Sequence, residues 1–264
     1  MISKLLGSLG WAGKYAFNQI YWHWKYRRNE AIIARYACLG VDVVRLLKPA
    51  YRIVNVQKGR VDYLIECWRN PRCRARTLPV IEHMQRAEII GCIMQQEILY
   101  DWMRPRKPMA LFMDSMAEHA DQRFVHKRDG WSFLCSYTDL AHTEKFRRAF
   151  NMAGLLPIDD LNKHFGLFFE EFRSRFGKIP IFYLHFPLKL ETRQKFRDRH
   201  LAIRQAVDCL ATEFQPLYSL AVDEAVVDRD EERTADLWSF PYHYNKRTYE
   251  EFAYLVRATG AWPG

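Results

Sequence analysis

Residues 109–115 read Met-Ala-Leu-Phe-Met-Asp-Ser, an apolar run that ends in a carboxylate and a hydroxyl. A short apolar run bounded by polar residues is typical of a buried strand. Three more such runs follow, at 131–136, 179–185 and 217–222. The stretches between them have apolar residues at helical spacing, so strands and helices are expected to alternate. This pattern predicts an α/β domain over residues 108–264, with a parallel sheet covered on both faces in three layers.

Three helices are expected around these strands. The first has one apolar face and a glycine that ends it: Leu161, Phe165, Phe168, Phe169, Phe172, Phe176 and Gly177. The second has the apolar face Phe196, Ile203, Val207, Leu210 and Phe214. The last, which ends near Gly260, has the apolar face Tyr249, Phe252, Ala253 and Val256.

The charge is distributed unevenly along the chain. Residues 1–108 contain 19 Lys/Arg and 8 Asp/Glu, whereas residues 109–264 contain 21 and 23. Apolar residues at helical spacing predict a long helix over 78–102, and two prolines in the following Met-Arg-Pro-Arg-Lys-Pro break it. We therefore predict a basic, aromatic-rich, mainly helical region over 1–107. Residues 30–76 fit either short strands or pieces of helix.

Residues 1–30 combine aromatic side chains with a basic cluster at Lys25, Arg27 and Arg28. Such a segment suits an anionic membrane surface, where rings lie at headgroup depth. It equally suits an amphipathic helix packed on its own domain. Nucleic acid is a third partner for basic and aromatic residues, but no recognisable motif supports it and we do not expect it.

The six cysteines are scattered, without metal-ligand spacing, so reduced thiols in a cytoplasmic protein are expected. The sequence contains no convincing secretory signal and no run of eighteen uncharged apolar residues. We predict no metal site and no cofactor. The protein is expected in the cytoplasm, with a peripheral position at the inner membrane if residues 1–30 bind lipid.

Polar residues follow the predicted strands. In parallel α/β sheets the functional site lies outside the carboxyl ends of the strands. This rule selects the candidate site residues Asp114, Ser115, Tyr137, Thr138, Asp139, His185 and Asp223. A serine that opens a helix beside such an edge is well placed for nucleophilic attack if a histidine takes its proton.

Three motifs resemble those of the SGNH (GDSL-type) serine hydrolases. Met113-Asp114-Ser115 is similar to the family's Gly-Asp-Ser, with methionine in place of glycine. His243-Tyr244-Asn245, with Tyr249 further on, matches the spacing of the family's His-Pro-Asn-x-x-Gly-Tyr before the last helix. Residues 136–140, Ser-Tyr-Thr-Asp-Leu, resemble its Gly-x-Asn-Asp block. The resemblance covers about 155 residues and implies an SGNH or flavodoxin-like sheet.

The resemblance implies roles for these residues. Ser115 would be the nucleophile and His243 its base. The family's acid lies three residues before the histidine, where this chain has Phe240, so the acid would be Asp236 or Asp223, or absent in a dyad. Thr138 stands where the family has its oxyanion asparagine. Asp114, Asp139, His185 and Asn245 would complete the oxyanion or substrate site.

The function implied is that of an esterase or O-acyltransferase acting on a carbohydrate or lipid-linked ester, in bacterial surface-polysaccharide metabolism. The alternative is a non-catalytic relative that binds sugar or serves as a scaffold, and Phe240 and Thr138 favour it. The third hypothesis, a nucleic-acid binder, rests on the basic front half alone.

Overall fold

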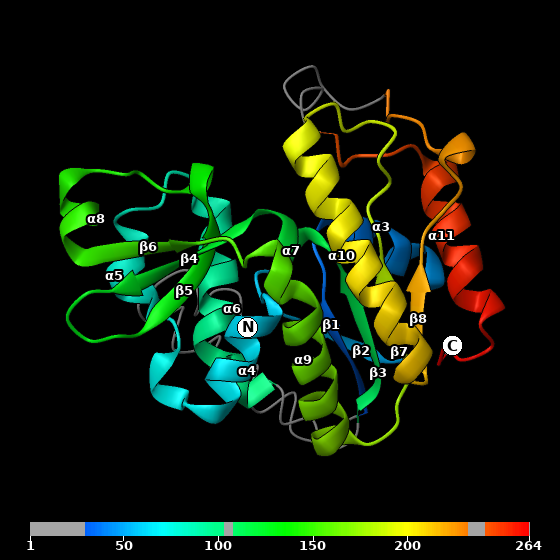
Figure 1. The fold of residues 1–264 in the computed structure, drawn as a ribbon, viewed down its shortest axis with the longest axis horizontal. Coiled ribbons are helices and arrows are strands. Elements are labelled where there is room, and N and C mark those ends of the chain that lie inside the picture. Colours follow the sequence, from blue (N-terminus) through cyan, green and yellow to red (C-terminus); the bar gives the residue numbers. More distant parts are fainter. Residues whose placement is uncertain (1–29, 103–107, 232–240, 264) are drawn as a thin grey trace, which may run out of the picture.

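The computed structural model describes residues 30–102, 108–231 and 241–263. A parallel sheet of five strands runs through the molecule in the order β2-β1-β3-β7-β8 (Figure 1). Its strands are β1 (Ala31–Arg35), β2 (Arg52–Asn55), β3 (Pro108–Asp114), β7 (Ile181–Leu184) and β8 (Leu217–Leu220). The predicted α/β class is therefore confirmed.

The chain builds this sheet in two directions. From β1 it moves outward to β2, and it then returns to β3 and continues through β7 to β8. In a doubly wound sheet the reversal opens a crevice at the carboxyl ends of the two strands where it occurs. Here those strands are β1 and β3.

The sheet begins at residue 31 and not, as predicted, at residue 108. Strand β1 pairs in parallel with β3, and Ile33 lies opposite Leu111. The expected first strand is therefore third in chain order, and a domain boundary at 107/108 would cut through the sheet. Strand β1 was not predicted because Ala31–Arg35 is short and directly follows a basic cluster. Within the region left open, residues 41–47 lie in a helix and 52–55 in a strand.

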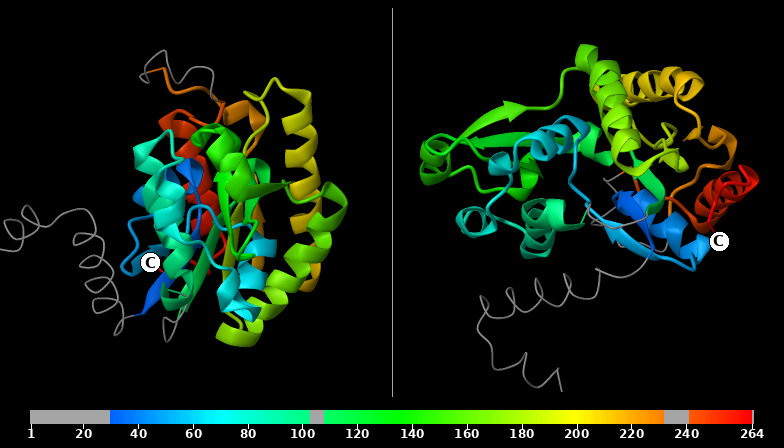
Figure 2. Two further views of the ribbon diagram at one scale, coloured as in Figure 1. Left: turned by 90° about the vertical axis from the view of Figure 1, so that its left-hand side faces the viewer. Right: turned by 90° about the horizontal axis from the view of Figure 1, so that it is seen from below.

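Helices cover both faces of the sheet (Figures 1 and 2). On one face, α3 (Cys38–Leu47) and α11 (Lys246–Ala258) pack against strand residues such as Ile32 and Phe112. On the other, α4 (Val61–Arg69), α9 (Leu161–Phe176) and α10 (Gln194–Glu213) pack against residues such as Ile33 and Leu111. Adjacent strand residues thus enter opposite cores, as the pleat of a strand requires.

The three predicted helices of the second half are confirmed. The phenylalanine face of α9 is buried except for the partly buried Phe176, and Gly177 ends the helix with φ 78°. That left-handed conformation costs glycine little, and the Gly177 N–H donates to Arg173 O. Helix α11 buries the whole apolar face predicted for it, and α10 buries Ile203, Val207 and Leu210 of its predicted face, while Phe196 and Phe214 are partly buried.

A second, antiparallel sheet lies beside the first, in the order β5-β4-β6. It comprises β4 (Asp121–His126), β5 (Ser132–Ser136) and β6 (Phe150–Gly154), with α7 (Met116–Ala120) before it and α8 (Glu144–Ala149) within it. The run at 131–136 was predicted to be a strand of the parallel sheet, and that prediction is wrong. The run folds back on β4 and contributes Trp131, Phe133 and Cys135 to a separate small core. A buried strand has the same apolar sequence pattern in either sheet, so the pattern does not show which core it joins.

The predicted helix over 78–102 is interrupted. The structure has α5 (Thr77–Ile81), a 3₁₀ turn η2 (Ala87–Ile89) and α6 (Ile90–Trp102). Between α5 and η2 the backbone pairs with the residues that follow β5. Met84 forms a bridge with Leu140, and Gln85 N–H donates to Asp139 O. Further 3₁₀ turns are η1 (Pro71–Cys73), η3 (Tyr137–Asp139), η4 (Ile158–Asp160) and η5 (Glu224–Val226). No helix in the described ranges has the length and apolarity needed to cross a bilayer.

Candidate active site

Ser115 lies at the carboxyl end of the central strand β3 and immediately precedes α7. Its side chain is buried, with 1% of its surface exposed. The hydroxyl oxygen accepts the Phe186 N–H at 3.4 Å, a bond that links the ends of β3 and β7. Backbone N–H groups also stabilise oxyanions, but there they bind the substrate's oxygen and not that of the nucleophile.

Asp114 fills the crevice between β1 and β3. Its Oδ2 accepts the N–H groups of Ala37 at 2.7 Å and Gly40 at 3.2 Å, and its Oδ1 accepts that of Met116 at 3.1 Å. The carboxylate thereby caps the N-terminus of α3. Burial nevertheless raises the pKa of Asp114 to about 6, although these N–H donors favour its charged form. The residue predicted for substrate contact is therefore engaged within the fold.

His243 is half-buried and lies between two buried tyrosines, Tyr242 and Tyr244. Both tyrosine rings pack on Phe186, with centroid separations of 5.2 and 6.4 Å. Because the Phe186 N–H also binds Ser115, the segment with His243 and the serine meet at one residue. The donor to the Ser115 hydroxyl oxygen is the Phe186 N–H.

Asn245 serves as the cap of α11. Its Oδ1 accepts the Thr248 N–H at 3.0 Å and the Thr248 hydroxyl at 2.9 Å. This is the usual role of asparagine before a helix. Asp223 likewise caps η5, by accepting the Ala225 N–H. Asp236, the predicted acid, lies outside the described residues.

Thr138 and Asp139 were predicted at the carboxyl edge of the parallel sheet. They lie instead on η3, after a strand of the small sheet. Thr138 is exposed. Asp139 is buried, and its carboxylate pairs with Lys58 at 3.3 Å and with Arg86 at 3.1 Å. The prediction failed because it assigned the preceding run to the wrong sheet.

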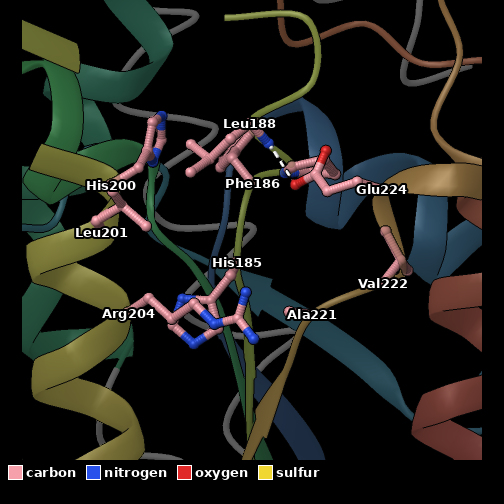
Figure 3. A pocket seen from close by; sticks show the side chains of 10 residues that line it. His185, Phe186, Leu188, His200, Leu201, Arg204, Ala221, Val222 and Glu224 are labelled. Atoms are coloured by element: carbon pink, nitrogen blue, oxygen red, sulfur yellow. Dashed lines mark hydrogen bonds between the residues drawn. The ribbon is translucent and has the colours of Figure 1, made fainter. Parts of the chain in front are cut away.

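His185 directly follows β7, at the carboxyl edge as predicted, but it is bound within the fold. Its Nε2 is 2.7 Å from the Ser219 hydroxyl, which donates in turn to Asp208. Burial lowers the pKa of His185 to about 3. The ring lines a cavity of about 20 Å³, together with His200, Arg204 and Glu224 (Figure 3). That volume suffices for one water molecule.

The sequence did not reveal a buried cluster beside Ser115, on α7 and the segments around it. Tyr242 Oη is 2.5 Å from Glu191 Oε2 and 2.5 Å from His119 Nε2. The His119 ring stacks on His200 at 3.8 Å with an angle of 12° between planes. At the edge of the cluster, Arg193, whose side chain is 49% exposed, donates to Glu191 at 2.7 Å. The members come from four separate stretches of chain, and no spacing rule connects them.

The hydrogen bonds of the cluster determine where its protons lie. Tyr242 Oη donates to the Glu191 carboxylate, so it accepts a hydrogen from His119 Nε2. The His119 Nδ1 and His200 Nε2 atoms are then buried without a hydrogen-bond partner in the described chain. A second proton on either ring would have no acceptor there, so both histidines are held neutral.

The pKa values follow from this arrangement. Burial lowers the pKa of His119 to about 2 and that of His200 to about 4. For Glu191, burial acts upward, but hydrogen bonds from Arg193 and Tyr242 outweigh it and hold the pKa at about 2. At neutral pH the cluster therefore combines one carboxylate, one neutral phenol and two neutral imidazoles.

Stability should fall between pH 6.5 and about pH 4. The unfolded histidines take up protons below about 6.5, whereas His119, His185 and His200 do not until lower pH in the folded chain. Each of these histidines lowers the free energy of unfolding by at most about 1.4 kcal/mol per pH unit in this range. The raised pKa values of Asp114 and Glu118 act in the opposite direction, but four histidines, His83 included, outnumber these two carboxyls.

Urea unfolding at several pH values would measure this dependence. The variant His200→Phe keeps the aromatic stack and removes one titrating group, so its stability should vary less steeply with pH. An unchanged slope would show that His200 does not contribute.

A larger cleft, of about 1000 Å³, lies between α3, residues 228–231 and the beginning of α11. Asp42, Arg45, Tyr244, Asn245 and Lys246 are among the residues that line it. Ser115 does not line this cleft, but Tyr244 does, and its ring packs on Phe186. Tyr244 therefore lies between the cleft and Phe186, the residue that binds Ser115.

Comparison with known proteins gives no assignment: no protein-family model matches this chain, and no curated protein matches its sequence.

Proposed function

We propose that this chain is a serine esterase or O-acyltransferase acting on a carbohydrate or lipid-linked ester, as its resemblance to the SGNH hydrolases implies. The observation that carries the proposal is the position of Ser115 at the carboxyl end of the central strand, with the Phe186 N–H at its hydroxyl oxygen. Tyr242 and Tyr244, on either side of His243, pack on the same Phe186.

In this proposal Ser115 attacks the acyl carbon of the ester. His243 takes the serine proton and returns it to the leaving alcohol. The Phe186 N–H, which already reaches the serine oxygen, would donate to the oxygen that becomes negative in the tetrahedral intermediate. An acyl-enzyme then forms, and water or a sugar hydroxyl receives the acyl group. Asp236 stays the proposed acid.

The proposed substrate class agrees with the larger cleft. Its lining combines both signs of charge with an amide and tyrosines, including Tyr244 and Tyr249. Its charged and amide side chains offer hydrogen bonds to a hydroxyl-rich ligand, while Tyr244 and Tyr249 are buried in its wall. We propose that the protein works in the cytoplasm, peripheral to the inner membrane, where residues 1–30 would bind anionic lipid.

Covalent labelling with a fluorophosphonate probe tests the proposed chemistry. We expect the wild type to be labelled and Ser115→Ala and His243→Ala to lose labelling, because the first removes the nucleophile and the second its base. Ser219→Ala is the matched control, since Ser219 is a second serine bound to a histidine, at 2.7 Å. Labelling that persists in Ser115→Ala and disappears in Ser219→Ala would contradict the proposal.

A non-catalytic, sugar-binding relative is the second candidate, and the burial of Ser115 favours it. Only 1% of this residue is exposed, while Asp114 and Asn245 are both engaged as helix caps. For this candidate, folded wild type would stay unlabelled yet bind acetylated oligosaccharides. Charge reversal at the cleft, for example Asp42→Lys, would then weaken that binding.

A further inference from the structure

A pair of cysteines lies outside the site described above. Cys67 lies on α4, and Cys73 closes the turn η1 that follows this helix. Their sulfur atoms are 3.4 Å apart and both residues are buried. The remaining described cysteines include Cys135, in the small core, and the exposed Cys209 on α10.

The backbone of the turn brings the two cysteines together. Asn70 N–H donates to Glu66 O and ends α4, and Cys73 N–H then donates to Asn70 O. The Asn70 side chain accepts the Arg72 N–H at 3.2 Å. Pro71 further restricts the chain. Several hydrogen bonds thus hold the backbone of the turn that carries the two cysteines.

We propose that Cys67 and Cys73 are a site of reversible oxidation and form a disulfide that closes the turn between α4 and η1. A disulfide has an S–S distance of about 2.05 Å, so the sulfurs need to approach by about 1.4 Å. Residues six positions apart in a turn that already holds their sulfurs in contact can make this adjustment by rotating side chains.

The two thiols are chemically unequal. The hydrogen bond from Cys67 lowers the pKa of Cys73, and Arg123 acts in the same direction. Burial, and then the interaction with Cys73, raise the pKa of Cys67. Cys73 also adjoins exposed residues of the turn, Pro71 and Arg72. Cys73 is therefore the sulfur that reacts first, and Cys67 is the one that resolves the intermediate.

The oxidant that suits a buried pair is a small peroxide. The Cys73 thiolate attacks one oxygen of hydrogen peroxide, the O–O bond breaks, and the leaving hydroxide takes a proton to become water. The product is a sulfenic acid. Cys67 sulfur then attacks Cys73 sulfur, the S–O bond breaks, and the second oxygen leaves as water with the Cys67 proton. Two electrons pass from the thiols to the peroxide.

The proposed disulfide would also affect the contacts between α4 and the small sheet. Tyr63, on the same helix as Cys67, accepts the Ala75 N–H at 2.9 Å and donates to Ser132 O at 3.2 Å. Trp68, beside Cys67, stacks on Phe168 at 5.3 Å. A covalent link at the turn would therefore hold the path from α4 to the second sheet, and it would limit the opening of this region.

Thiol counting on the full-length chain tests the inference. In a Cys209→Ser background, which removes the exposed thiol, the reduced protein is treated with hydrogen peroxide and labelled with N-ethylmaleimide in denaturant. We expect two fewer thiols to be labelled, a peptide that links Cys67 to Cys73, and recovery with dithiothreitol. The oxidised form should also melt at a higher temperature than the reduced form.

Variants distinguish this pair from other thiols. Adding Cys73→Ser should abolish the loss of two thiols, whereas adding Cys135→Ser should leave it intact. Full labelling after oxidation, or an equal loss of thiols in Cys73→Ser, would overturn the inference. If a variant fails to fold, peptide mapping of the oxidised background protein decides alone, because the linked peptide is either present or absent.

Discussion

Arg35→Met should lower the free energy of unfolding by about 3–5 kcal/mol, because it leaves a buried carboxylate without its cation. Arg35 ends β1, and its NH1 is 2.8 Å from Glu118 Oε2, with side chains 2% and 0% exposed. The Tyr183 ring lies beneath the guanidinium, at 5.9 Å. Among the described residues, Glu118 would keep only backbone donors, including the Val61 N–H at 3.0 Å. Urea unfolding monitored by circular dichroism measures the loss.

Two controls separate the buried charge from the loss of side-chain volume. Arg45→Met breaks the pair with Asp42, whose arginine is 73% exposed, and should leave stability nearly unchanged. The double variant Arg35→Met with Glu118→Gln should recover part of the loss, since the orphaned charge is gone. A double variant that is less stable than Arg35→Met would show that the unpaired carboxylate is not the cause.

Lys58→Met should cost a similar amount, about 3–5 kcal/mol, and should act on the small sheet first. The Lys58 ammonium contacts Asp121 at 2.9 Å, Ser136 at 3.2 Å and Asp139 at 3.3 Å. Asp139 also has Arg86, but Asp121 Oδ2 is buried without a hydrogen bond in the described structure. Without Lys58, Asp121 would be a buried charge at the start of β4.

Hydrogen exchange measured together with urea unfolding would check this second expectation. Because Lys58 follows β2 and its partners lie around β4 and β5, protection should fall in β4–β6 before it falls in the parallel sheet. The matched control is Lys145→Met, which breaks an exposed pair with Glu82 and should change little. Uniform loss of protection over both sheets would contradict a local role for Lys58.

Periodicity predicted the parts of the fold in which one face meets one core. The phenylalanines of α9 recur at helical spacing because that face lies on the sheet, and Gly177 ends the helix as predicted. Strands β3, β7 and β8 were found because apolar residues run through them. Assignment to a sheet could not be predicted for β5, since burial of Phe133 in a small core leaves the same pattern.

The site was less predictable, because its polar contacts join distant residues. The rule of the carboxyl edge located Ser115, Asp114 and His185 correctly at strand ends. It could not show that Tyr242 would bond to His119, 123 positions away. A signal for Arg35 was present: a lone charge closes the apolar run Ala-Ile-Ile-Ala-Arg, and a charge in a buried strand needs a partner. Nothing local indicated that Glu118 is that partner.

The carboxylate of Asp114 also determines what the crevice between β1 and β3 can accept. The N-terminus of a helix attracts phosphate and carboxylate groups, and in doubly wound sheets it commonly receives those of a ligand. Here the N-terminus of α3 already has an anion, because strand β3 presents Asp114 to the N–H groups of Ala37 and Gly40. An incoming anion would compete with a group that is tethered and never diffuses away. The chain thus carries its own counter-ion and excludes a charged ligand group from this helix end.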